Sequence, residues 1–191
     1  MKPIVIATLA TVLCSWAIWE AARTGIERTL AERAELTGEI DSADRAIKLA
    51  PNDAEAHFAR GEVLQNSEDY SGASVEFERA VQLRPRDYFL WLMLGVTRDE
   101  NQDQEGALRA LRQAAALAPS YAPPRWQLGN LLLRKGQYDE AFTELRRAAI
   151  GNPNLWPNVI DLAWGIYGGD VDAVVRVMQQ IGRSTRLNSS H

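Results

Sequence analysis

The stretch "QLRPRDYFLWLMLG" (residues 82–95) places a proline, charged residues, a nearly unbroken apolar run and a glycine close together. Proline is not tolerated inside a helix, so Pro85 marks the end of one helix. Asp87 is a residue type that caps the start of the next one. The apolar run then supplies the packing face of that helix, and Gly95 marks a point of close contact. The stretch therefore predicts two successive helices joined by a short turn.

The prolines show that this stretch is one copy of a repeat. Pro51, Pro85, Pro119 and Pro153 recur at a constant interval of 34 residues, and self-similarity at a fixed period is the signature of repeat architectures. Four other columns keep the same interval: Gly61, Gly95 and Gly129; Ala73, Ala107 and Ala141; Phe77, Leu111 and Leu145; Ala80, Ala114 and Ala148. So many columns in register predict one structural unit per repeat.

The residue types in these columns predict pairs of antiparallel helices. Small residues in the glycine and alanine columns allow two helices to approach closely, since a larger side chain would push their backbones apart. Each large residue, such as Phe77, fills the space beside them. Apolar residues at steps of three and four indicate helices rather than strands. Each unit therefore reads as helix, turn, helix and proline.

This pattern resembles the tetratricopeptide repeat family. The stretches that carry the resemblance are "YFLWLMLGV" (88–96), "APPRWQLGNLL" (122–132) and "QYDEAFTELRRAAIGNP" (137–153). Trp91 fits the family's tryptophan column, whereas His57 and Arg125 replace that residue in the neighbouring units and Trp126 lies one residue late. The resemblance implies an all-α fold, a right-handed α-solenoid of antiparallel helix pairs. From the N-terminal segment, described below, we expect one transmembrane helix to precede this solenoid.

The chain divides into successive segments on this basis. We expect a transmembrane anchor or signal segment at 1–22, a stem with a degenerate first repeat at 23–53, repeats at 54–87, 88–121 and 122–155, a diverged fourth repeat or cap at 156–182, and a tail at 183–191. The tail, "RSTRLNSSH", is polar and without periodicity. It resembles a translated sequencing adapter, so we expect it to be disordered and artefactual. Three stacked units suffice to bury a continuous core.

The N-terminal segment predicts a membrane anchor. Residues 3–19 carry no charge, and at about 1.5 Å per residue they reach the length that a bilayer span requires. Trp16 and Trp19 lie at the far end, where aromatic rings favour the headgroup level. The alternative is a signal peptide cleaved after Ala17. A lipid attached to Cys14 is disfavoured because the bulky Leu13 precedes it.

The position of the segment predicts where the repeats lie. A two-residue tail before a first hydrophobic segment is typical of a signal anchor, although Lys2 is opposed by Arg23, Arg28 and Arg33 beyond the span. We therefore expect a single-pass protein of the bacterial inner membrane with its repeats in the periplasm.

The composition argues against several functional classes. A net charge of −4 and a pI near 5.3 give no basic field for nucleic acid. One cysteine and two histidines leave no basis for a metal site or a disulfide framework. The sequence contains no glycine-rich phosphate loop, nucleophile elbow or zinc signature. We therefore expect no enzymatic activity, no cofactor and no small-molecule substrate.

The first helices of the repeats predict a surface for a partner. In stacked helix pairs the first helix of each pair lines the concave side. The residues predicted to form this groove are Phe58, Glu62, Phe89, Leu92, Val96, Trp126, Asn130, Arg134 and Trp164. Aromatic side chains bury large areas at low entropy cost, which suits a protein or peptide ligand with hydrophobic anchors. The alternative, that some rings pack between repeats, stays open.

Together these features predict a membrane-anchored scaffold that assembles an envelope complex. Two other functions are compatible with the same sequence. In the first alternative, the chain is the N-terminal docking part of a longer enzyme that is truncated at the adapter-like tail. In the second, it is a secreted soluble repeat protein released by cleavage.

Overall fold

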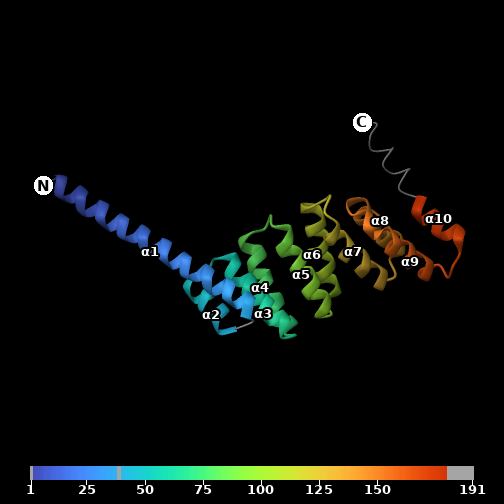
Figure 1. The fold of residues 1–191 in the computed structure, drawn as a ribbon, viewed down its shortest axis with the longest axis horizontal. Helices are drawn as coiled ribbons and strands as arrows, with labels where there is room; N and C mark the ends of the chain where they lie inside the picture. Colours follow the sequence, from blue (N-terminus) through green and yellow to red (C-terminus); the bar gives the residue numbers. More distant parts are fainter. Residues whose placement is uncertain (1, 38–39, 180–191) are drawn as a thin grey trace. The chain divides into compact units, whose positions relative to one another are not determined.

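Helices form the regular secondary structure of the described residues, so the predicted all-α class is confirmed (Figure 1). The structure is a computed structural model that describes the backbone of residues 2–37 and 40–179, and the side chains of residues 12–30 and 40–179. The tail expected at 183–191 lies outside these residues. The chain forms two compact units, Met1–Pro85 and Arg86–His191, which are described separately and called unit 1 and unit 2.

The described residues of unit 1 form four helices. They are α1 (Lys2–Thr37), α2 (Ile40–Leu49), α3 (Ala54–Asn66) and α4 (Tyr70–Leu83). α3 and α4 form a pair, and α1 packs against both α2 and α3. The first half of α1 extends beyond the other helices of this unit, whereas its second half lies beside α2 and α3 (Figure 1). α1 is therefore part of the packed unit only over its later turns.

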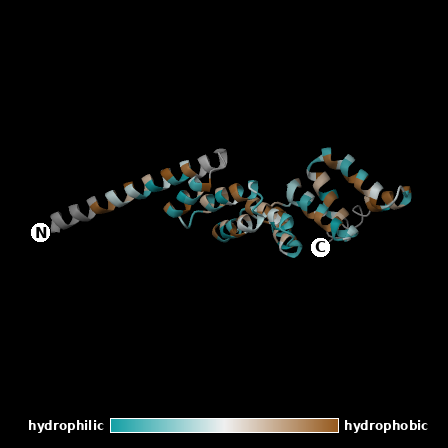
Figure 2. Cartoon of the chain, turned by 90° about the horizontal axis from the view of Figure 1, so that it is seen from below, coloured by the Kyte–Doolittle hydropathy of each residue, from teal (hydrophilic) through white to brown (hydrophobic). Residues whose placement is uncertain are grey.

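In unit 2, residues 86–179 form three successive helix pairs. The elements are α5 (Tyr88–Glu100), α6 (Gln104–Leu117), α7 (Ala122–Arg134), α8 (Tyr138–Gly151), the 3-10 turn η1 (Pro153–Leu155), α9 (Trp156–Ile166) and α10 (Val171–Gln179). α6 packs on α7 and α8 packs on α9, so adjacent pairs stack within the unit. Apolar and polar residues alternate along these helices (Figure 2), as amphipathic helices require.

Aspartates begin the first four helices of the paired repeats, and equivalent caps in the two pairs are 34 residues apart. Asp53, Asp69, Asp87 and Asp103 each accept a hydrogen bond from a backbone N–H of the first turn of α3, α4, α5 and α6. Such caps satisfy donors that have no partner within the helix. α7 begins differently, with Pro123 in its first turn, where a missing N–H costs nothing.

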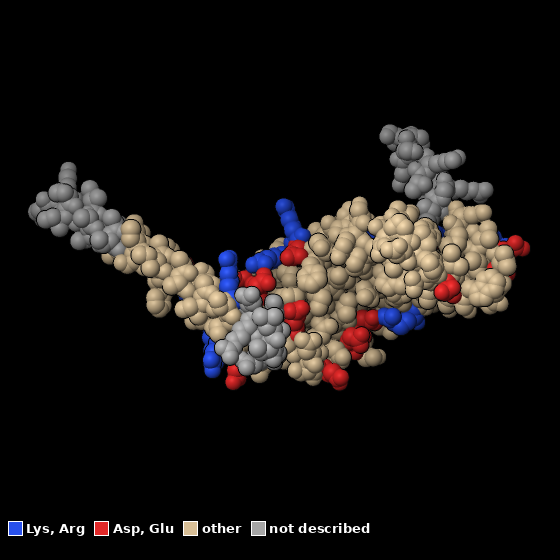
Figure 3. Space-filling model, in the orientation of Figure 1, with Lys and Arg blue, Asp and Glu red and all other residues tan. Residues whose placement is uncertain are grey.

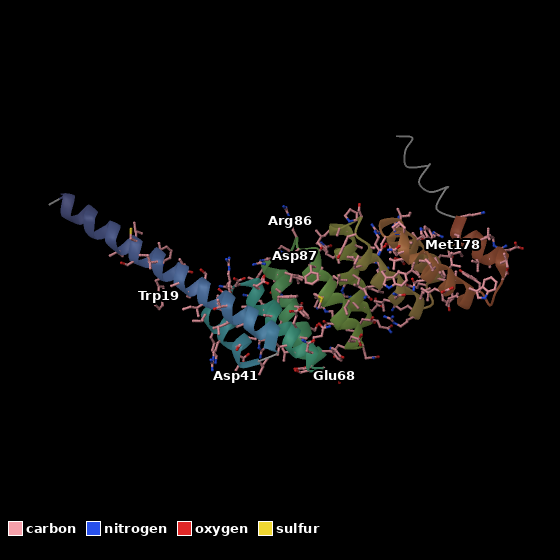
Figure 4. The ribbon with its side chains drawn as sticks, in the orientation of Figure 1. Trp19, Asp41, Glu68, Arg86, Asp87 and Met178 are labelled. Atoms are coloured by element: carbon pink, nitrogen blue, oxygen red, sulfur yellow. The ribbon has the colours of Figure 1, made fainter. Side chains whose placement is uncertain are left out.

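In the pairs α3–α4, α5–α6 and α7–α8, the turn between the two helices contains a residue in the left-handed region. The φ angles are 62° at Glu68, 65° at Gln102 and 71° at Gly136, and these residues follow the repeat interval. Glu68 is labelled at the end of α3 in Figure 4. A residue with a Cβ pays about 1 kcal/mol or more for this conformation. Of the three turns, only the one at Gly136 avoids that strain.

The glycine column is required by the large residue that faces it. A Cβ at Gly61 would lie 2.7 Å from the Phe77 ring, one at Gly95 would lie 2.7 Å from Leu111 Cγ, and one at Gly129 would lie 2.6 Å from Leu145 Cγ. All three distances are shorter than van der Waals contact allows. Because Phe77, Leu111 and Leu145 are fully buried, the first and second helix of each pair can meet only if the column carries no side chain.

The anchor predicted at residues 3–19 is not supported by the structure. In the part of the chain that the structure describes, no helix combines the length and the apolarity of a membrane span. The side chains of residues 1–11 lie outside that part. The anchor therefore stays a prediction.

Candidate functional site

The two groove residues predicted in unit 1 lie in different environments. Phe58 on α3 is buried, with 8% of its surface exposed, and its ring centroid lies 5.7 Å from that of Phe77 on α4. Glu62, one turn later on α3, is half-buried. The Phe58 ring therefore contributes to the core between α3 and α4.

On α5 the predicted groove residues differ in burial in the same way. Leu92 is 8% exposed and belongs to a core cluster that includes Leu108 and Leu128. Val96 is half-buried against that cluster. Phe89 is 42% exposed, so it is the large side chain that α5 presents to solvent.

α7 and α9 carry the remaining predicted residues. Trp126 is half-buried against a cluster that contains Phe142 and Val159, and Asn130 is half-buried. Arg134 is exposed and forms an ion pair with Asp99 at the end of α5. Trp164 on α9 is 51% exposed. We use the name first-helix surface for five side chains of unit 2 that stay wholly or partly exposed: Phe89, Val96, Trp126, Asn130 and Trp164.

Two of the three positions in the tryptophan column hold a polar bridge instead of a tryptophan. His57 has Nδ1 2.7 Å from a carboxylate oxygen of Glu76 and Nε2 3.0 Å from the carbonyl oxygen of Pro51. Arg125 donates from Nη1 to Glu144 at 2.5 Å and from Nε to the carbonyl oxygen of Pro119 at 2.8 Å. Each bridge ties the second helix of its pair to the preceding proline.

The residue nineteen positions after each tryptophan-column position changes with the residue in that column. The residue nineteen positions later is Glu76 after His57 and Glu144 after Arg125, but it is Ala110 after Trp91. Each polar column residue therefore faces a glutamate, whereas the tryptophan is followed at the same interval by a small residue. Sequence analysis noted the replacements and missed their partners, although this interval was available as a signal.

The bridge in unit 1 shifts the pKa values of both partners. The hydrogen bond to Glu76 raises the pKa of His57 above 6.5, against the opposing effect of burial. Burial tends to raise the pKa of Glu76, but the hydrogen bond from His57 and the charge of Arg60 outweigh it and lower that pKa below 4.5. Arg60 also donates to Asp44 of α2 at 2.6 Å, so the bridge extends across α2, α3 and α4.

We predict that the two members of the bridge in unit 2 can be exchanged only together. Glu144→Ala should lower the free energy of unfolding by about 3 kcal/mol, because it leaves the guanidinium of Arg125 without its carboxylate in a buried place. The double variant Arg125→Trp/Glu144→Ala copies the pair Trp91 and Ala110, and should recover most of that loss. Chemical denaturation of Glu144→Ala, Arg125→Trp and the double variant measures the coupling free energy between the two positions. Equal losses in Glu144→Ala and the double variant would contradict this pairing.

Unit 1 contains a cavity that sequence analysis did not predict. Its volume is about 420 Å³. It is lined by Arg23, Thr24 and Glu27 of α1, by residues 50–53 of the α2–α3 connection and Ala54 of α3, and by Leu83 and Arg84 at the end of α4. Acidic and basic side chains are mixed on the face of unit 1 drawn in Figure 3. The cavity therefore combines charged and apolar walls within one unit.

Glu27 is the unusual residue of this cavity. Only 1% of its surface is exposed, and neither carboxylate oxygen has a hydrogen-bond partner among the described residues. Burial, together with the nearby carboxyl group of Asp53, raises the pKa of Glu27 to about 7. Burial also acts on Asp53, but the N–H of Glu55, the carboxyl of Glu27 and the charge of Arg84 prevail and lower the pKa of Asp53.

A second buried charge lies in unit 2. Arg146 on α8 is almost fully buried, donates from Nη2 to Thr143 Oγ1 at 3.3 Å, and has an Nε without a partner in the described part of the chain. Burial and the neighbouring Arg147 lower the pKa of Arg146. Within residues 12–30 and 40–179, no group of three or more histidine, cysteine, aspartate or glutamate side chains could hold a metal ion.

Comparison with known families identifies the class of protein. Two family models, each described as tetratricopeptide repeat, match residues 54–87 and 100–162. Together they account for just over half of the chain. With the paired helices and the glycine column, these matches show that the chain belongs to the tetratricopeptide repeat family.

Solved structures share this fold. A crystal structure of MamA superimposes with a TM-score of 0.71 at 20% identity, over 83% of this chain and 90% of that one. The crystal structure of YrrB, a TPR protein with an unusual peptide-binding site, gives a TM-score of 0.64 at 22% identity, over 92% of this chain and 96% of that one. At such identities the likeness shows the fold alone. No curated protein matches the sequence.

Proposed function

We propose that this protein is a scaffold that binds a peptide segment of another protein on the first-helix surface of unit 2. The observation that carries the proposal is the exposure of two large aromatic side chains, Phe89 and Trp164, on first helices of the pairs. Tryptophan is among the residue types most enriched at positions that dominate binding energy, and aromatic side chains in general are enriched in interfaces. The fold of the family leaves these helices available for a partner.

The chemistry of the surface indicates the kind of segment that it suits. Phe89, Trp126 and Trp164 offer apolar contact, so the segment needs hydrophobic side chains as anchors. Asn130 supplies an amide that can both donate and accept a hydrogen bond, which suits the main chain of an extended peptide. The likeness of the fold to YrrB, a TPR protein with a peptide-binding site, supports a peptide as the partner.

Site-specific photocrosslinking in the source cells tests this function. A photoreactive amino acid at position 89 or 164 should capture a protein partner. The same amino acid at Ile150 of α8, which is also exposed but lies on a second helix, should capture little. Equal capture at positions 150 and 164, or a Trp164→Ala variant that keeps partner binding at the wild-type level, would contradict the proposal.

We further propose that residues 3–19 hold the protein in a bacterial inner membrane, with the repeats in the periplasm and the scaffold serving an envelope complex. The absence of charge over seventeen residues supports an anchor. Val12, Leu13, Trp16 and Trp19 are exposed on the part of α1 that extends beyond the rest of unit 1, and Trp19 is labelled there in Figure 4. An apolar environment would remove these side chains from water.

Fractionation of the source cells separates this placement from a soluble one. The protein should sediment with membranes after a high-salt wash and dissolve only in detergent. Protease added outside spheroplasts should digest the repeats. Recovery in the soluble fraction with a new N-terminus after Ala17 would instead establish a secreted protein.

A further inference from the structure

The cavity of unit 1 contains a carboxyl group whose charge is not compensated. Both cations in its wall are paired with carboxylates, although Arg23 Nε has no partner among the described residues. Arg23 donates to Glu20 at 2.7 Å, and Arg84 divides its guanidinium between Asp53 at 3.3 Å and Glu55 at 3.1 Å. Neither oxygen of Glu27 has a hydrogen-bond donor among the described residues, although its carboxyl group lies beside that of Asp53 and interacts with it. The carboxyl groups of Glu27 and Asp53 are therefore the groups in this cavity that a cationic hydrogen-bond donor would satisfy, beside one donor without a partner, Arg23 Nε.

We propose that this cavity binds a guanidinium group, held by the carboxylates of Glu27 and Asp53. The two oxygens of Glu27 are both unoccupied by any described donor, and a guanidinium presents two parallel N–H groups that fit one carboxylate in a bidentate manner. An ammonium group is a compact point charge without this geometry.

The other walls of the cavity suit the stem of such a ligand. A volume of about 420 Å³ falls within the range of small-molecule sites, roughly 300–1,000 Å³. Ala50, Ala54 and Leu83 line it beside the carboxylates. The methylene stem that carries a guanidinium packs on apolar surface of this kind. The cavity therefore offers a charged end and an apolar side to one extended group.

Binding of a cation should be linked to the protonation of Glu27. The charged groups that act on Glu27 are Asp53 of the α2–α3 connection and Arg28 and Arg23 of α1, and Arg84 of α4 acts on Asp53. A guanidinium favours the ionised carboxylate, so its binding releases a proton from the fraction of molecules in which Glu27 is protonated. With a pKa of about 7, affinity should rise about tenfold between pH 6 and pH 8.

A guanidinium group can come from two sources. One is a free small compound that carries the group on an alkyl chain. The other is the arginine side chain of a protein that docks on unit 1. Both sources offer the same chemistry to Glu27 and Asp53, and two probes distinguish them: agmatine for the free compound, and the peptide acetyl-Gly-Arg-Gly-amide for the side chain.

Isothermal titration of the full chain in detergent tests the proposal. At least one of the two probes should bind saturably, about tenfold tighter at pH 8 than at pH 6, with proton release that shows in buffers of different ionisation enthalpy. Binding of agmatine identifies a free compound as the ligand, and binding of the arginine peptide alone identifies a partner segment. Failure of both probes to bind, or equal affinity for the lysine counterpart of the peptide, would refute the guanidinium site.

Two variants assign the binding to the cavity. Glu27→Gln keeps the shape of the side chain and removes its charge, so it should weaken binding at pH 8 at least tenfold and abolish the pH dependence. Glu55→Gln removes a carboxylate that pairs with Arg84 outside the cavity lining and should leave affinity within about twofold. Circular dichroism checks that both variants fold. Unchanged affinity in a folded Glu27→Gln protein would overturn the assignment.

Discussion

Gly95→Leu is expected to unfold the first helix pair of unit 2. A Cβ at this position would lie 2.7 Å from Leu111 Cγ and 3.2 Å from the backbone nitrogen of Leu111, and the leucine branches would have to enter the same space. The side chain of Leu111 could move, but the backbone of α6 could not without separating the pair. We expect a loss of about 3 kcal/mol or more of unfolding free energy, which is a large part of the stability of a typical domain.

A matched substitution controls for helix propensity. Gly165→Leu makes the same change on α9, at a position where a Cβ would meet no atom of the described residues within 4 Å. Its melting temperature, measured by circular dichroism, should equal or exceed that of the wild-type protein, since leucine favours helix over glycine. If Gly95→Leu melts like Gly165→Leu, the close approach of α5 and α6 at Gly95 is incorrect.

Glu27→Gln is expected to stabilise unit 1 in alkaline solution. The folded pKa of Glu27 is raised from 4.5 to about 7, so between these pH values the folded state binds more protons than the unfolded state. Folding stability therefore falls as pH rises from about 4.5 to 7, and the loss is complete above pH 7. A shift of this size corresponds to at most about 3 kcal/mol. Glutamine cannot ionise, so the variant should keep this stability at pH 8.

Chemical denaturation at pH 4.5 and pH 8 measures the effect. The wild-type protein and Glu27→Gln should have similar unfolding free energies at pH 4.5, and the variant should be more stable at pH 8. Glu55→Gln, which changes an exposed carboxylate close by, should follow the pH dependence of the wild-type protein. A difference between wild type and Glu27→Gln that stays constant with pH would show that Glu27 does not titrate in this range.

The repeats could be predicted because each one is defined by local and periodic signals. Gly61, Gly95 and Gly129 face Phe77, Leu111 and Leu145 within single helix pairs, so the contact that defines a pair is contained in one repeat length. The N-cap at Asp87 is likewise a contact between near neighbours, with Phe89 N–H donating to its side chain at 2.9 Å. Such interactions leave a pattern in the sequence without any knowledge of the tertiary structure.

The burial of first-helix residues could not be predicted in the same way. Leu92, Trp126 and Ile160 occupy one column of the repeat, yet Leu92 is buried, Trp126 is half-buried and Ile160 is exposed. Leu92 is buried because Leu128 and other residues of α7 pack in the same core cluster. The exposure of a column residue therefore depends on the pair that follows, and periodicity does not record that pair.

The cavity was missed for a related reason. Glu27 is buried by contact between α1 and the start of α3, and α1 carries none of the repeat columns. The residues that surround it, Asp53 and Arg84, come from two other segments of the chain. An isolated glutamate in a charged helix gives no sign that a distant segment will cover it.

Because α1 is one continuous helix, unit 1 is connected rigidly to the first turns of that helix. One helix runs from Lys2 to Thr37, and its later turns pack against α2 and α3. At about 1.5 Å per residue, residues 19–30 form a stiff rod roughly 17 Å long. A partner or surface that binds the first turns of this helix therefore fixes the distance and the orientation of unit 1 relative to itself. A flexible linker would leave both free to vary.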